Sequence, residues 1–306
     1  MTKTAFLFAG QGAQTVGMGR DLYDSFSIIR DTFEEANHVL GYDVRQLIDT
    51  DESKLNQTRY TQPAILTLSV AIYRLLAEKG IEADMVAGLS LGEYAALVAS
   101  GALDFKTAVA LIAKRGEFME TAAPLGTGKM VAILNTDVAL IEEVCKQVTS
   151  GIVAPANYNT PAQIVIGGDV AAVDEALEKL KERGVKRMIP LNVSGPFHTA
   201  LLKPASEKLK EALDKVEFSD FQVEVVGNTE AKVMKKEEIK SLLTRQVMEP
   251  VRFYESIATM KEAGVSRFIE IGPGRVLSGF IKKIDKTAES LVVEDLASLE
   301  NVLASL

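Results

Sequence analysis

The chain has 306 residues, of which 47% are hydrophobic and 25% charged, and its formal net charge is −8. This length accommodates one large domain or two modest ones, and the composition excludes a disordered or fibrous protein. The acidic balance argues against a general nucleic-acid binder, although basic clusters such as residues 181–187 could contact an anionic partner.

Cysteine and histidine are scarce in this sequence. Cys145 is the single cysteine, so an intramolecular disulfide is excluded and a reducing compartment is expected. With only His38 and His198, no Cys/His cluster has the spacing of metal ligands. The apolar stretch AFLFAG is too short for a membrane span or a secretory core. We therefore predict a cytoplasmic protein with no metal site and no membrane association.

The first part of the chain alternates short apolar runs with helical patterns. We predict, in order, a strand over 4–10, a glycine-rich loop GQGAQ, helices over 26–40 and 63–79, a strand over 84–88, and helices over 91–100 and 104–120. Pro63 lies near the start of the second helix, and Gly80 follows its end, as helix boundaries often require.

The stretch GLSLGEY, residues 88–94, contains the pattern G-x-S-x-G around Ser90. In a nucleophile elbow this pattern forms a sharp turn between a strand and a helix and exposes the serine hydroxyl. The predicted strand over 84–88 and the helical pattern after Ser90 supply that context. Ser90 is therefore our candidate nucleophile.

Residues 128–191 have a rhythm of their own. We predict strands over 129–134, 152–158, 162–168 and 185–191, with helices over 138–148 and 170–184. This βαββαβ order is that of a ferredoxin-like subdomain. Glycine and proline on both flanks favour hinge connections, so we interpret 128–191 as an insertion into a domain made of 1–127 and 192–306.

Strands and helices alternate again after the insertion. We predict a helix over 199–215, a strand over 222–226, helices within 236–263, a strand over 267–271, a helix over 274–284, a strand over 291–295 and a terminal helix. Such alternation indicates an α/β fold in which helices cover both faces of a parallel or mixed sheet.

A serine nucleophile needs a general base, most often a histidine. His38 lies near the predicted C-terminus of a helix, where a partly exposed histidine is a routine stabilising residue. His198, in the loop SGPFHT, is the remaining candidate, with a polar loop residue as the alternative. No acidic residue stands out as a third member, and a backbone carbonyl could orient the imidazole instead.

Arg115 falls in the middle of the apolar face of the helix predicted over 104–120. A cation there is costly unless it is paired or its head reaches water, so a snorkelling arginine or a structural ion pair is one interpretation. The other is a guanidinium held in a dry cleft to bind a substrate carboxylate. The loop AGQGAQ lacks the G-x-G-x-x-G spacing of a nucleotide site, and its backbone N–H groups could instead form an oxyanion hole.

At this point the chain closely resembles the malonyl-CoA:acyl-carrier-protein transacylases of bacterial fatty acid synthesis. The resemblance extends over the whole length and rests on FAGQGAQ, TQPAI, GLSLGEY, KRG around Arg115, ANYNTPAQIVIGG, SGPFH, the Gln246 region and FIEIGPG. It implies an α/β-hydrolase-like large domain with the inserted ferredoxin-like subdomain, and no metal or redox cofactor.

The resemblance also implies a role for each of several residues. Ser90 would be the nucleophile and His198 its base, with the imidazole oriented by the main-chain carbonyl of Gln246. The backbone N–H groups of Gln11 and Leu91 would form the oxyanion hole. Arg115 would bind the malonyl carboxylate, and Gln62 and Asn157 would be further members of the substrate site. Phe197 resembles the form of this loop that selects malonyl over methylmalonyl. Many relatives have histidine where this chain has Leu89, and we expect that difference to change packing or polarity near the elbow without abolishing activity.

The implied reaction is a ping-pong transfer of malonyl from malonyl-CoA to the phosphopantetheine thiol of an acyl carrier protein, by a monomer. The acidic carrier would need a local basic patch, and Lys181 to Arg187 and the lysines after Gly279 are candidates. Three alternatives stay open: an acyltransferase that serves a polyketide synthase, a serine thioesterase or carboxylesterase, and a non-catalytic acyl-binding module.

Overall fold

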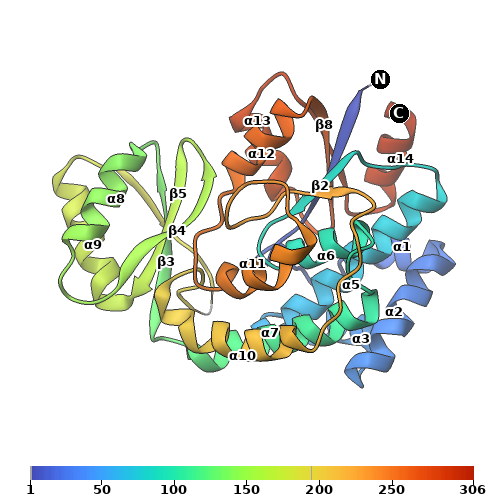
Figure 1. Ribbon diagram of the computed structural model, residues 1–306, viewed down its shortest axis with the longest axis horizontal. Coiled ribbons are helices and arrows are strands. Elements are labelled where there is room, and N and C mark those ends of the chain that lie inside the picture. The colour runs from blue at the N-terminus through green and yellow to red at the C-terminus, as the bar shows by residue number, and fades with distance from the viewer. Residues whose placement is uncertain (1, 194) are drawn as a thin grey trace.

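The computed structural model describes residues 2–193 and 195–306 and has an α/β architecture with two separate sheets (Figure 1). Ser194, which belongs to the stretch SGPFH, lies outside the described residues. The strands are β1 Lys3–Phe8, β2 Met85–Gly88, β3 Gly128–Leu134, β4 Val153–Thr160, β5 Gln163–Asp169, β6 Arg187–Pro190, β7 Glu224–Val225, β8 Val265–Ile271 and β9 Glu289–Val293.

The helices come from all parts of the chain. They are α1 Arg20–Ser25, α2 Ser27–Leu40, α3 Val44–Thr50, α4 Glu52–Leu55, α5 Thr58–Glu78, α6 Gly92–Ala99, α7 Phe105–Ala122, α8 Val138–Gln147, α9 Val170–Glu182, α10 Lys203–Asp214, α11 Ile239–Gln246, α12 Phe253–Glu262, α13 Val276–Ile284 and α14 Leu296–Ser305, with short 3₁₀ turns at Ala200–Leu202 and Lys236–Glu238.

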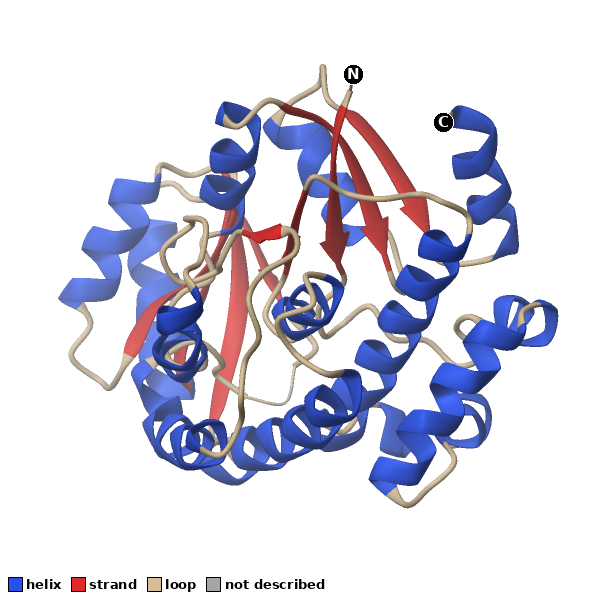
Figure 2. Ribbon diagram, turned by 45° about the vertical axis from the view of Figure 1, so that its right-hand side comes forward, coloured by secondary structure: helices blue, strands red, loops and turns tan. Residues whose placement is uncertain are grey.

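The larger sheet has the strand order β7-β2-β1-β8-β9, and each neighbouring pair is parallel. Side chains of β1 alternate between its two faces, as the pleat requires. Phe6 and Phe8 belong to the main hydrophobic core with residues of α5, α6 and α7, whereas Ala5 and Leu7 belong to a second core with residues of α12 and α13. Helices therefore cover both faces of this sheet, as predicted (Figure 2).

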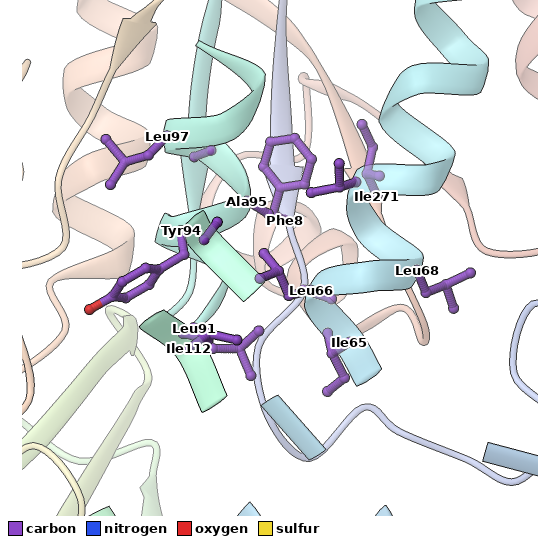
Figure 3. Packing of buried hydrophobic residues seen from close by; sticks show 14 of the residues in the cluster. Phe8, Ile65, Leu66, Leu68, Leu91, Tyr94, Ala95, Leu97, Ile112 and Ile271 are labelled. Atoms are coloured by element: carbon purple, nitrogen blue, oxygen red, sulfur yellow. The ribbon is translucent and has the colours of Figure 1, made fainter. Parts of the chain in front are cut away.

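The main core lies directly behind the predicted nucleophile elbow. Figure 3 shows Phe8 of β1 and Ile271 of β8 beside residues of α5 and α6. Leu91, the residue after Ser90, is 1% exposed and belongs to this core. The turn that carries Ser90 is thus anchored in tightly packed apolar side chains, which limits its freedom to move.

The smaller sheet is antiparallel, with the strand order β4-β5-β3-β6, and it stands beside the larger unit (Figure 1). One face of this sheet packs on α8 and α9, where Val131 and Ile166 share a core with residues of both helices. On the other face, Met130 and Val165 join the main hydrophobic core. The smaller sheet therefore presents this second face to the larger unit.

The structure differs from the sequence prediction in a few elements. α5 begins at Thr58, five residues before the predicted start, so Pro63 lies inside the helix and not at its first turn. Thr58 and Thr61 of this first turn are buried, and so are all residues from Gln62 to Ile72, so the packing of this helix outweighs the one backbone hydrogen bond that the proline removes. The strand predicted over 222–226 is confined to Glu224–Val225, and the short helices α1, α3 and α4 were not predicted.

Candidate active site

Ser90 lies in a tight turn between β2 and α6, at the C-terminal edge of the parallel sheet. Its φ angle is 55°, a left-handed conformation that residues other than glycine rarely adopt. A Cβ atom on Gly88 would lie 2.0 Å from the Gly92 carbonyl, and one on Gly92 would lie 2.2 Å from the Phe8 oxygen. Both glycines of the G-x-S-x-G pattern are thus required by close backbone contact, as a nucleophile elbow demands.

His198 lies beside Ser90, with 2.9 Å between its Nε2 and the Ser90 Oγ. Its Nδ1 lies 2.7 Å from the main-chain oxygen of Gln246. Because a carbonyl oxygen can only accept, Nδ1 carries the proton and Nε2 is free to accept the serine proton. Burial, together with the positive charge of Arg115, lowers the pKa of His198 to about 4, so the imidazole is neutral near pH 7.

The other histidine is far from this arrangement. The His38 side chain is 73% exposed on α2, and its Nδ1 lies 2.8 Å from the Glu34 carbonyl oxygen. It lies in the last turn of its helix, as the sequence pattern predicted.

The Arg115 side chain is buried at 1% exposure and reaches the nucleophile itself. Its Nη1 donates to the Gln62 Oε1 at 2.8 Å, and its Nη2 donates to the Ser90 Oγ and to the Gln246 Oε1, each at 2.9 Å. Within the described chain, all these hydrogen bonds go to neutral side chains, so neither snorkelling nor a direct ion pair accounts for the arginine. Burial lowers its pKa, yet a guanidinium keeps its charge in proteins.

A buried polar network that the sequence analysis did not predict supports the elbow. Asn228 accepts from the Ser90 backbone N–H at 2.7 Å and donates to the Gly88 carbonyl at 2.6 Å. The Glu93 carboxylate accepts from the Asn228 backbone N–H at 2.7 Å and from the Gln246 Nε2 at 2.5 Å. The position of Glu93, three residues after the serine in the motif, is the only signal that the sequence contained for this network.

We expect Asn228→Ala to lower the free energy of unfolding by about 2 to 6 kcal/mol, because it leaves the Ser90 N–H and the Gly88 carbonyl buried without partners, at roughly 1–3 kcal/mol each. Chemical denaturation measures this difference. The exposed Asn301→Ala on α14 is the matched control and should change stability by about 0.5 kcal/mol at most. Equal, small effects of the two substitutions would contradict a supporting role for Asn228.

A cavity of about 330 Å³ opens beside Ser90 between the two units of the molecule. The larger unit contributes part of its lining, namely Gln11, Ser90, Met119, Phe197 and His198. The smaller sheet contributes Met130 of β3, Asn157 and Asn159 of β4, and Gln163 and Val165 of β5. Leu89 lies on its wall with Val276 and Phe280 of α13, so this side of the cavity is apolar.

The remaining predicted residues also come together at this cavity or directly behind it. Gln62 is buried and places its Nε2 3.3 Å from the Gln11 Oε1. Leu91 lies behind the elbow. Among the described residues, the backbone N–H groups of Gln11 and Leu91 donate to no other protein group, which leaves them free for a ligand. The site thus combines a serine, a neutral imidazole, a buried cation and two free N–H donors around one cavity.

Two further properties concern the described residues as a whole. No helix among them is long and apolar enough to cross a membrane. Within residues 2–193 and 195–306, no group of three or more His, Cys, Asp or Glu side chains could hold a metal ion.

Comparison with known proteins shows which family this chain belongs to. Residues 5–301 match the acyl transferase domain, so the protein is an acyltransferase. The malonyl CoA-acyl carrier protein transacylase of Bacillus subtilis is 47% identical over 100% of this chain and 98% of its own length. The enzyme of the same name from Escherichia coli K12 is 43% identical over 99% of both chains.

Solved structures agree with the sequence relatives. MCAT from Streptococcus pneumoniae is 69% identical and superimposes with a TM-score of 0.98 over 99% of this chain and 100% of its own. A malonyl-transacylase in complex with the holo acyl-carrier protein of a type II polyketide synthase is 44% identical, with a TM-score of 0.97 over 100% of both chains. The chain belongs to the malonyl CoA-acyl carrier protein transacylase family, as the sequence resemblance predicted.

Proposed function

We propose that this acyltransferase moves the malonyl group from malonyl-CoA to the phosphopantetheine thiol of an acyl carrier protein, through an ester on Ser90. The observation that carries the proposal is the buried Arg115, whose Nη2 lies 2.9 Å from the Ser90 Oγ. A cation fixed beside the nucleophile suits an acyl group that has its own carboxylate, and a neutral acyl group does not need it.

In the first half-reaction, the Ser90 Oγ attacks the thioester carbonyl carbon while the His198 Nε2 accepts the hydroxyl proton. The backbone N–H groups of Gln11 and Leu91 stabilise the negative charge that develops on the carbonyl oxygen. The carbon–sulfur bond then breaks, and His198 returns its proton to the coenzyme A thiolate. The product is a malonyl ester of Ser90.

In the second half-reaction, the thiol of the carrier protein takes the place of coenzyme A. His198 accepts the thiol proton, the thiolate attacks the ester carbonyl, and the proton returns to the Ser90 oxygen as the ester bond breaks. Water is the competing nucleophile, and the position of the cavity between the two units limits the directions from which water can approach.

Arg115 binds the malonyl carboxylate in this proposal. Its hydrogen bond to the Ser90 Oγ is replaced by bonds to the carboxylate, while Gln62 and Gln246 keep the guanidinium plane in place. Phe197 and Asn157 lie on the cavity wall, and we assign Phe197 to the selection of malonyl over methylmalonyl. Such a difference of one methyl group is worth about 1–3 kcal/mol in a pocket.

We also assign a fold to each of the two units of the molecule. We interpret residues 1–127 and 192–306 as an α/β-hydrolase-like domain, because the serine elbow follows a parallel strand. We interpret 128–191 as a ferredoxin-like subdomain, supported by its βαββαβ order and its antiparallel strand order β4-β5-β3-β6. All proposed catalytic groups come from one chain, which is compatible with a monomer, and the single cysteine favours the cytoplasm.

A second candidate function differs only in the pathway that is served. The 44% identical malonyl-transacylase was solved with a carrier protein of a type II polyketide synthase, so the present chain could load such a carrier as well. Fatty acid synthesis is our first choice of pathway. The curated relatives that share 43% to 47% identity over nearly the full chain are malonyl CoA-acyl carrier protein transacylases, the class that the sequence resemblance assigned to this pathway.

Incubation with malonyl-CoA and a holo carrier protein tests the proposal. We expect malonyl-carrier and free coenzyme A in equal amounts, with little free malonate. Rapid formation of malonate without transfer would indicate a thioesterase, and a folded protein that releases no coenzyme A would indicate a binding module.

A further inference from the structure

Glu93 is a buried acid that the proposed reaction does not use. It lies in the first turn of α6 and is 1% exposed. We propose that Glu93 is a positioning residue, whose ionised carboxylate fixes the side chain of Gln246 and through it Arg115 and the Ser90–His198 pair. This inference rests on the proposed function, because it assigns Glu93 to the acyl transfer at the same site.

Gln246 contacts all three of the groups that would act on the substrate. Its Oε1 accepts from the Arg115 Nη2 at 2.9 Å, its Nε2 donates to the Ser90 carbonyl oxygen at 3.0 Å, and its main-chain oxygen holds the His198 Nδ1 at 2.7 Å. The position of this one residue therefore bears on the nucleophile, the base and the cation together.

Glu93 and the Ser90 carbonyl together fix which way the Gln246 amide points, and Glu93 makes the shorter of the two contacts with the amide nitrogen, at 2.5 Å against 3.0 Å. Arg115 can only donate, so it requires the amide oxygen, and the carboxylate of Glu93 requires the amide nitrogen, which lies 2.5 Å from its Oε2. The other carboxylate oxygen accepts from the Asn228 backbone N–H at 2.7 Å. Since both oxygens face donors, a carboxyl proton has no acceptor there, and the geometry selects the ionised form.

A neutral group cannot reproduce these contacts. In Glu93→Gln, the new amide has one acceptor oxygen for two donors, so its NH₂ group must face either the Gln246 Nε2 or the Asn228 N–H. In either orientation one donor is unpaired and repelled. The Gln246 amide is then held less firmly, because the bond from its Nε2 to the Ser90 carbonyl is left without the charged contact, and Arg115 loses a firmly placed acceptor.

Protonation of Glu93 should have the same effect as this substitution. Burial raises the pKa of Glu93 to about 7, against the opposing effects of the Asn228 N–H, Arg115 and the Gln246 amide. The charged or titratable groups around it are Arg115, which stays charged, and Tyr94, whose pKa burial raises above its usual range. His198, whose pKa is lowered to about 4, stays neutral from pH 6 to 8.

The test compares single-turnover acylation of Ser90 by malonyl-CoA and by acetyl-CoA in the wild-type protein, Glu93→Gln and Glu270→Gln. Glu270 is a matched control, because it is also 1% exposed and accepts from two backbone N–H groups, those of Leu277 and Ser278. Among the described residues it has no hydrogen bond to Gln246, Arg115 or His198. Melting temperatures of all three proteins separate lost stability from lost activity.

We expect Glu93→Gln to reduce the malonyl rate by between about 10- and 100-fold, and the acetyl rate by less, because a displaced guanidinium harms only the carboxylate-bearing substrate. Glu270→Gln should lower the melting temperature and leave the malonyl-to-acetyl ratio at the wild-type value. A folded Glu93→Gln with the wild-type ratio, or an equal change of the ratio in Glu270→Gln, would overturn the proposal.

A second measurement needs no variant to fold. In the wild-type protein, the malonyl-to-acetyl ratio should fall as the pH decreases through about 7, because Glu93 is ionised above its pKa and neutral below it. The phosphates of coenzyme A titrate equally in both substrates and cancel in the ratio. A ratio that stays constant from pH 8 down to the lowest pH at which the protein is still folded would overturn the positioning role, whereas no acylation by either substrate would refute the proposed function itself.

Discussion

Ser90→Ala should abolish the acyl-enzyme and reduce malonyl transfer by roughly 10⁶-fold, the scale found when an enzyme loses its serine nucleophile. Ser90 is the hydroxyl that contacts both the His198 Nε2 and the Arg115 Nη2, each at 2.9 Å. In the alanine variant no oxygen is left at this position to form the ester. The change removes one atom without altering the turn, so we expect only a small change in melting temperature.

Intact mass and a coupled transfer assay, applied to the same sample, measure both effects. The matched control is Ser206→Ala, which removes a buried hydroxyl that donates to the Thr244 carbonyl outside the proposed site. That variant should keep its acyl adduct. A stable malonyl adduct on folded Ser90→Ala would refute Ser90 as the nucleophile.

Arg115→Ala should reduce acylation by malonyl-CoA by roughly 10²- to 10⁴-fold, which corresponds to the 3–5 kcal/mol typical for a buried charge that loses its partner. Acetyl-CoA has no carboxylate, so we expect a much smaller loss with it. The acetyl rate should still change somewhat, because Arg115 also donates to the Ser90 Oγ and its charge helps to lower the pKa of His198.

Arg115→Lys is the matched variant for this prediction. It keeps the charge but loses the planar fork that contacts Gln62, Ser90 and Gln246 at once, so its malonyl rate should lie between those of the wild-type protein and Arg115→Ala. Comparison of the two substrates at equal concentration gives the selectivity directly. Equal losses for malonyl and acetyl in Arg115→Ala would sink the assignment of the carboxylate site.

The proposed catalytic centre was predictable because its signals are local. The G-x-S-x-G pattern lies between a strand and a helix that periodicity detects, and both glycines are explained by close backbone contact. A chain with two histidines leaves one realistic base. The position of Arg115 on an apolar helix face marked it as either a structural cation or a substrate-binding one, and the structure finds this residue 1% exposed.

The polar network behind the site was not predictable in the same way. Asn228 contacts the backbone of Ser90 across 138 residues of sequence, and no local pattern marks it. The role of the Gln246 carbonyl came from family resemblance, because a main-chain oxygen has no signature in a sequence. Strand order is likewise a tertiary property: periodicity indicated an α/β fold, but it did not give the order β7-β2-β1-β8-β9.

The measurement that tests the central claim most directly is intact-mass spectrometry after brief incubation with malonyl-CoA alone, followed by peptide mapping and then by addition of a holo carrier protein. We predict one malonyl group on Ser90 that persists in water and moves to the carrier thiol. Free malonate without a lasting adduct, or an adduct mapped to another residue, would contradict the account.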